Sequence, residues 1–173
     1  MSKLITCIWF ANNDGEEAAK YYIDTFNSAP GDHSAKMGDI TKSPKAVEEA
    51  SGRPEGSVLT AEYELDGISF MALNGGPDHK FTEAISFFVD CKTQEEVDEL
   101  WNKLTEGGEE GPCGWLKDKF GLSWQIIPRV LGELLGDPDP AKSQSVMQAM
   151  LQMKKIDIKA LQEAYKQAPV RSK

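Results

Sequence analysis

Cysteine is scarce in this sequence, and its placement excludes several kinds of site. The 173 residues contain three cysteines, Cys7, Cys91 and Cys113, which are widely separated and form no CxxC pair. An odd number of isolated cysteines does not suit a disulfide framework or a structural zinc site. We therefore expect three reduced thiols.

Long apolar runs and an excess of positive charge are also missing. No stretch approaches the roughly 20 apolar residues of a membrane span, and residues 1–14 lack the apolar core and cleavage site of a signal peptide. The formal net charge of −9 argues against a nucleic-acid-binding face, which must be basic to displace counterions. These absences favour a cytosolic protein that binds neither membranes nor nucleic acids.

The chain begins with a strand pattern followed by a helix pattern. Residues 4–11 (LITCIWFA) are β-branched and aromatic, which predicts a buried strand. The next segment predicts a helix with Asn13 or Asp14 as its N-cap and an apolar stripe that reaches Phe26. Residues 28–56 are polar and rich in Gly, Pro and Ser, so they receive no assignment beyond a turn of helix at AVEEA.

A hairpin pattern completes the first half. Residues 57–67 (SVLTAEYELDG) alternate between apolar and polar side chains, and ISFMALNGG returns as a second strand. Asp66-Gly67 predicts the two-residue turn between them, because both central positions of that turn need positive φ.

The second half repeats this order of elements. A strand is predicted at 82–91, and a helix follows with Thr93 and Glu96 as a capping box and Gly107 as its stop. GWLKD and LSWQIIP predict two strands joined by a turn near Phe120-Gly121. Shifting the chain by about 79 residues superposes the two patterns, which indicates an internal repeat.

The repeat predicts an α+β fold of paired βαβββ modules. Module one is expected at about residues 3–76 and module two at about 80–128, both within a domain that spans 1–128. Residues 129–173 are expected to form a C-terminal helical extension of the same domain. Two curved sheets that face one another would enclose a cleft, which is a usual place for a small-molecule site.

The extension is predicted to contain two helices with apolar sides. Asp139-Pro140 is a good helix start, and a Met stripe at 147, 150 and 153 follows it. The segment DIKALQEAYKQ predicts a second helix. Their apolar surface needs a cover, either the protein's own sheet or a partner subunit.

Several of these segments carry a resemblance to a known family. IWFANNDGEEAAKYY, LTAEYELDG, SFFVD and CGWLKDKFGLSWQIIP resemble the PhnB-like branch of the vicinal oxygen chelate superfamily, which includes glyoxalases, bleomycin-resistance proteins and extradiol dioxygenases. The resemblance implies paired βαβββ modules and a homodimer. Many similar sequences carry a demethylubiquinone methyltransferase label, but this chain lacks the Gly-rich strand-to-helix turn that cradles adenosylmethionine.

Enzymes of this superfamily hold a divalent metal with side chains from four strands, usually His and Glu. The resemblance places the corresponding positions here at about Cys7, Met71–Leu73, Glu83 or Ala84, and Gln125. A neutral amide is a weak ligand for Zn²⁺ or Fe²⁺, and a lone thiolate opposite it lacks imidazole partners. His33 and His79 lie in polar loops. We therefore expect a cleft without a bound metal or other cofactor.

Residues predicted to line the cleft follow from strand alternation. If Gln125 faces the cleft, Ser123 and Ile127 lie beside it and Trp124 packs under the helix. Ser86 is a polar neighbour on the preceding strand, and no histidine lies in sequence context to activate Cys7 as a nucleophile. The predicted ligand-binding residues are Cys7, Trp9, Met71, Ser86, Ser123 and Gln125.

Three classes of function stay open on the sequence alone. The favoured one is binding or sequestration of a small organic molecule, like that of the bleomycin-resistance members. The alternative is a metal-dependent lyase, isomerase or dioxygenase with unusual ligands. The third is a structural protein whose cleft is filled by Trp9 and Phe88.

Overall fold

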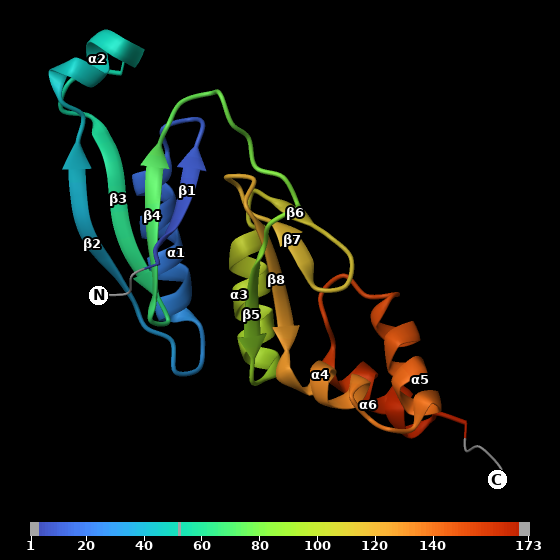
Figure 1. The fold of residues 1–173 in the computed structure, drawn as a ribbon. Coiled ribbons are helices and arrows are strands. Elements are labelled where there is room, and N and C mark those ends of the chain that lie inside the picture. The colour runs from blue at the N-terminus through green and yellow to red at the C-terminus, as the bar shows by residue number, and fades with distance from the viewer. Residues whose placement is uncertain (1–3, 52, 170–173) are drawn as a thin grey trace. The chain divides into compact units, whose positions relative to one another are not determined.

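The structure, a computed structural model, describes residues 4–51 and 53–169. The chain divides into two compact units, Met1–Phe81 and Thr82–Lys173. Each unit contains one four-stranded sheet, as Figure 1 shows. Among the described residues, no helix combines the length and the apolar character that crossing a bilayer requires.

The first unit has the predicted βαβββ order with one added helix. Its elements are β1 (Thr6–Phe10), α1 (Gly15–Ser28), β2 (Ala35–Lys42), α2 (Lys45–Ser51), β3 (Val58–Leu65) and β4 (Ile68–Asn74). The strands are ordered β1-β4-β3-β2, and β1 runs parallel to β4. The predicted turn of helix at AVEEA is α2, and β2 occupies much of the segment that had no assignment.

Side chains alternate between the two faces along each strand, so the buried side chains of this unit lie on one face of its sheet. α1 lies along that face (Figure 1), and its Ala18, Ala19 and Tyr22 are fully buried. Tyr63 and Phe70 stack on neighbouring strands with ring centroids 5.2 Å apart. The predicted hairpin turn is confirmed, since Asp66 and Gly67 both have positive φ, at 48° and 80°.

The predicted N-cap position of α1 is confirmed, but its side chain does not cap the helix. Asp14 occupies the N-cap position but makes no side-chain cap hydrogen bond. Instead, the Gly15 N–H donates to Asn74 Oδ1 at 2.9 Å, and Asn74 Nδ2 donates to the Val58 carbonyl at 3.0 Å. A Cβ at residue 15 would lie 2.7 Å from Asn74 Oδ1, so this contact requires glycine. One buried amide therefore ties α1 to β3 and β4.

The second unit repeats the topology of the first. Its sheet elements are β5 (Phe87–Cys91), α3 (Gln94–Thr105), β6 (Glu109–Glu110), β7 (Trp115–Lys117) and β8 (Ser123–Pro128). The strands are ordered β5-β8-β7-β6, with β5 parallel to β8. This order matches β1-β4-β3-β2 strand for strand, so the predicted pair of βαβββ modules is confirmed.

The sequence predicts the start of α3 better than the start of β5. β5 begins at Phe87 and not at residue 82, because Ala84 N donates to Thr82 Oγ1 in a turn that precedes the strand. The capping box is confirmed: Thr93 Oγ1 accepts from Glu96 N at 3.2 Å, and Glu96 Oε2 accepts from Lys92 N at 2.6 Å.

The C-terminal helices pack on the end of the second sheet. They are α4 (Arg129–Leu135), which the sequence pattern did not predict, α5 (Pro140–Met150) and α6 (Ile158–Lys166). Val146 and Leu161 are fully buried in one cluster with Ile127 of β8. Their apolar sides are therefore covered mainly within the unit, although Met147 and Leu151 stay 39% and 57% exposed.

A buried carboxylate fixes the hairpin at residues 114–128. Asp118 is 3% exposed, and its Oδ1 accepts from Phe120 N and Leu122 N at 2.9 and 3.0 Å. Its Oδ2 accepts from the Trp124 indole N–H at 2.8 Å. Asp118 therefore fixes the hairpin from the interior of the unit.

The first stability prediction concerns Asn74. Asn74→Ala leaves the Gly15 N–H and the Val58 carbonyl without their partner, so we expect the free energy of unfolding to fall by about 2 kcal/mol. Urea unfolding followed by circular dichroism measures it. Asn27→Ala is the matched control, because Asn27 also makes two bonds to the backbone, at Ala35, but is exposed; about 0.5 kcal/mol or less is expected there. Equal losses in the two variants would contradict the role of burial.

The second stability prediction concerns Asp118. Asp118→Asn keeps the size of the side chain but leaves at most one acceptor oxygen for three donors, so we expect a loss of about 2 kcal/mol. Trp124→Phe removes one donor. The double variant should therefore lose about 1 kcal/mol less stability than the sum of the losses in the two single variants. A double-mutant cycle in urea measures this difference. Strictly additive losses would show that the indole bond contributes nothing.

Candidate functional site

The second sheet has one covered face and one open face. Leu116 and Trp124 are each 2% exposed and pair with one another in the β7–β8 register. Trp124 also packs against Phe87, with ring centroids 5.3 Å apart. Because strand side chains alternate, Trp115, Lys117, Ser123 and Gln125 point to the opposite face. The predicted inward packing of Trp124 is therefore confirmed.

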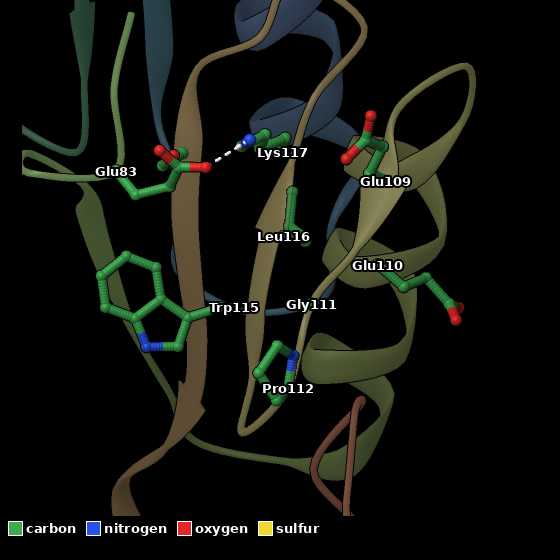
Figure 2. Close-up of a pocket in the computed structure, with 9 residues that line it drawn as sticks. Glu83, Glu109, Glu110, Gly111, Pro112, Trp115, Leu116 and Lys117 are labelled. Atoms are coloured by element: carbon green, nitrogen blue, oxygen red, sulfur yellow. Dashed lines mark ion pairs between the residues drawn. The ribbon is translucent and has the colours of Figure 1, made fainter.

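A pocket of about 460 Å³ lies beside β6, β7 and β8 in this unit. Figure 2 shows the Trp115 and Lys117 side chains of β7 extending to one side and those of Glu109 and Glu110 extending to the other. The lining residues are Glu83, Glu109, Glu110, Gly111, Pro112, Trp115, Leu116, Lys117 and Ser123. This volume suits a small organic molecule.

Ser123 gives the pocket an unpaired polar group. The residue is 2% exposed, and its Oγ is buried without a hydrogen-bond partner in the described part of the chain. Leaving a buried hydroxyl unpaired costs about 1–3 kcal/mol. A hydroxyl in this state on the wall of a pocket is a ready donor and acceptor for a bound molecule.

Gln125 lies between two aromatic residues on the open face. It pairs with Phe88 on β5 and with Trp115 on β7, and Phe88 is 59% exposed. Gln125 Nε2 donates to Ser86 Oγ at 2.9 Å. The structure thus brings together Ser86 and Gln125, with Ser123 two residues before Gln125 on the same face of β8.

Charged side chains lie at the rim of the pocket. The Lys117 ammonium forms an ion pair with the Glu83 carboxylate, drawn as a dashed line in Figure 2. Hydrogen bonding to Glu83 raises the pKa of Lys117, and the same bond lowers the pKa of Glu83. Glu110 accepts from the Trp101 indole and from Lys154, and the Trp101 bond is the main reason that its pKa lies below the usual range. The pocket therefore carries more negative than positive charge.

The other predicted ligand-binding residues lie in the first unit. Cys7 and Met71 are paired on β1 and β4. Trp9 is half-buried, its indole N–H donates to the Gly76 carbonyl at 2.8 Å, and its ring contacts the His79 ring edge-on at 4.7 Å. A Cβ at Gly75 would overlap the Trp9 ring. Trp9 therefore holds the segment after β4 in place, and its indole N–H is already engaged by the Gly76 carbonyl.

The donor set at the superfamily's metal positions does not fit a transition metal. In each module the first strand pairs with the last, and the registers join Cys7 to Met71 and Phe88 to Gln125. The second-module position is thus Phe88, not Glu83 or Ala84, which precede the strand. Thioether, phenyl and amide groups are poor ligands, and partial desolvation raises the pKa of the Cys7 thiol although its side chain is exposed. In the described residues no three His, Cys, Asp or Glu side chains gather as a metal site.

One wall of the pocket was missed by the sequence pattern. The acidic run TEGGEEG at residues 105–111 has the composition of a solvated helix end, yet Glu109 and Glu110 form β6, and Gly111 and Pro112 lie in the connection to β7. A two-residue strand is too short to show alternation. The only local signal is Gly-Pro beside a predicted strand, which marks a turn without stating what the turn lines.

Comparisons with known proteins agree with this architecture. The PhnB protein from Bacillus cereus is 29% identical, with a TM-score of 0.59, over 73% of this chain and 99% of its own. The crystal structure of protein PA1353 from Pseudomonas aeruginosa has 16% identity and a TM-score of 0.53, over 72% of this chain and 95% of its own, which shows the fold alone. A search of curated proteins finds no match.

A family model connects these observations. The model described as 3-demethylubiquinone-9 3-methyltransferase matches residues 2–127, which include both βαβββ modules and end at β8. The PhnB-like resemblance of the sequence is thereby confirmed. This protein belongs to the 3-demethylubiquinone-9 3-methyltransferase family.

Proposed function

We propose that this protein binds a small, planar organic molecule at the second sheet and does so without a metal ion. The observation that carries the proposal is the unpaired, buried Ser123 hydroxyl on the wall of a pocket of about 460 Å³. A bound molecule that hydrogen-bonds Ser123 would remove the cost of that unpaired group. Sequestration of the molecule, as in the bleomycin-resistance members that the sequence resembles, is the role that this arrangement favours.

The side chains around the pocket define the class of ligand. Trp115 offers a flat apolar surface, which suits an aromatic or conjugated ring. Gln125 Oε1 accepts no hydrogen bond from the described residues, since the recorded bond of this amide uses Nε2. The carboxylates at the rim disfavour anions. A neutral or cationic ring that carries an N–H donor therefore fits best.

Methyl transfer is not supported by the chain's own residues. The β1–α1 connection contains Asn13 and Asp14, and its single glycine, Gly15, is packed against Asn74, Ala72 and Phe10. A nucleotide-binding turn needs several glycines that let the ligand approach the backbone. Gly15 is instead used to let Asn74 approach, so we propose that the family name does not describe the activity of this chain.

We also propose that the protein acts as a homodimer in the cytosol. The exposed Met147 and Leu151 side chains on the outer side of α5 would gain from burial against a second copy. Light scattering on the purified chain tests the dimer; a monomer at micromolar concentration would reject it.

The third prediction tests the pocket with benzamide as the probe, measured by calorimetry. Trp115→Ala should weaken binding by at least about 10-fold, because it removes the aromatic wall. Ser123→Ala should weaken binding severalfold without lowering the free energy of unfolding, because the hydroxyl has no partner to lose.

Ser43→Ala is the matched control for the serine variant. Ser43 is also 2% exposed with an unpaired Oγ, but it belongs to the first unit. Its benzamide affinity should equal that of the unaltered protein. Binding that is unaffected by both Trp115→Ala and Ser123→Ala would reject the pocket as the site.

The fourth prediction separates binding from metal-dependent catalysis. Protein purified without chelator should contain far less than one transition-metal ion per chain by plasma mass spectrometry. Gln125→Glu should not change this, because a carboxylate that pairs with Phe88 and Trp115 on the neighbouring strands still lacks the further ligands that a tight site needs. One tightly held ion per chain, lost in Gln125→Ala, would support the enzyme instead. Calorimetry with adenosylmethionine should show no binding.

A further inference from the structure

A second cavity, of about 250 Å³, lies in the first unit. It is formed where α1 begins and where the chain leads from α2 into β3. The lining residues are Asn13, Glu16, Arg53, Pro54, Ser57, Val58 and Asn74. None of these residues lines the pocket of the second unit.

Arg53 gives this cavity a cation without a partner. Its Nε and Nη1 atoms are buried and donate no hydrogen bond in the described part of the chain. A buried guanidinium normally pairs with a carboxylate, because removing a charge from water is costly unless an opposite charge or good acceptors replace the water. The Nε–H and Nη1–H groups point in different directions in the guanidinium plane, and each is a charge-assisted donor of the kind that an oxyanion accepts from.

The carboxylate among the lining residues, that of Glu16, does not supply that partner. Glu16 lines the same cavity, but its Oε1 accepts from Lys20 Nζ at 2.7 Å. That hydrogen bond, with a smaller contribution from the charge of Lys42, holds the pKa of Glu16 below its usual range. Because Glu16 is already neutralised by lysine, Arg53 is the unmatched charge of the cavity.

Unpaired polar atoms concentrate in this corner of the first unit. The described residues contain four buried side-chain atoms without a partner, and Ser43 Oγ, Arg53 Nε and Arg53 Nη1 are three of them. Ser43 is held against the loop that carries Arg53, since its N–H donates to the Ser57 carbonyl at 2.7 Å and its carbonyl accepts from Gly56 N at 2.8 Å. Three unpaired atoms on two residues of connected segments require an explanation, and a bound ligand would supply one.

We infer that this cavity binds the oxyanion group of a small molecule, a carboxylate or a phosphate, through the Arg53 guanidinium. The guanidinium supplies the positive charge, and its Nε–H or Nη1–H donates to an oxygen of the anion. The Asn13 side chain, which is exposed at the rim and makes no hydrogen bond in the described residues, is a further donor. The volume of about 250 Å³ holds the anion together with a short organic chain. The site is independent of the proposed benzamide-binding pocket, so either can fail without the other.

The test uses the full chain and two simple probes, inorganic phosphate and acetate, at constant ionic strength set with chloride. Calorimetry measures binding, and thermal unfolding measures stabilisation by each anion. We expect at least one probe to bind, and Arg53→Met to weaken that binding by about 10- to 100-fold, the effect of losing hydrogen bonds to a charged group. Preference for phosphate or acetate identifies the oxyanion.

Two further variants make the result specific. Arg129→Met is the matched control, because Arg129 is exposed and already paired with Asp90 at 2.6 Å; it should bind the probe as the unaltered protein does. Arg53→Lys keeps the charge without the planar guanidinium and should bind with intermediate affinity. Without added anion, Arg53→Met should unfold at the same temperature as the unaltered protein or higher, because the guanidinium has no partner to lose.

The inference fails on clear outcomes. If neither anion binds, or if Arg53→Met and Arg129→Met bind the anions alike, Arg53 is not an anion ligand. If Arg53→Met is strongly destabilised in chloride alone, the guanidinium serves the fold and not a bound anion.

Discussion

The candidate site in the second unit depends on the three hydrogen bonds that Asp118 accepts. Two of them close the turn between β7 and β8, and the third holds the Trp124 indole on the side of the sheet that α3 covers. Side chains alternate along a strand, so fixing Trp124 also fixes Ser123 and Gln125 on the opposite face. A slip by one residue would bury the amide and bring the indole to the open face. The chemistry of the pocket is thus set by a carboxylate that does not line it.

The two modules repeat their topology but not the interactions that stabilise it. In the second, Asp118 acts on residues at most six positions away. In the first, Asn74 joins the start of α1 to β3 across 59 and 16 residues of chain. The strand orders are nevertheless the same, because both modules bury one face of a sheet under one helix. The fold thus tolerates a change in the interactions that stabilise it. On the open faces no helix dictates the residue type, and the paired residues differ: they are Cys7 and Met71 in one module and Phe88 and Gln125 in the other.

Local patterns in the sequence predict most of this fold, and the failures have a common cause. Asp66-Gly67, the Thr93–Glu96 capping box and the alternation around Gln125 depend on neighbours within a few residues, and the structure confirms them. Asp14 is the N-cap of α1 as predicted, but the acceptor at the helix start is the distant Asn74. The pocket wall at residues 109–112 was missed because β6 is defined only by its pairing with β7. Arg53 lies in a segment too polar for any periodicity to show. Functional groups placed by distant contacts leave no local pattern.

The buried atoms without partners connect the fold to function. Most buried polar groups in folded proteins are satisfied, because each unpaired one costs about 1–3 kcal/mol. Here the described residues contain four such atoms, at Ser43, Arg53 and Ser123, and Arg53 and Ser123 each line a cavity. A chain selected for stability alone would replace these residues with apolar ones of similar size, as buried ion pairs can be replaced at little cost. Their presence beside cavities is explained if a ligand completes each of them, and the two cavities then differ in the charge they accept: carboxylates surround Ser123, whereas Arg53 is the unmatched charge of its own cavity.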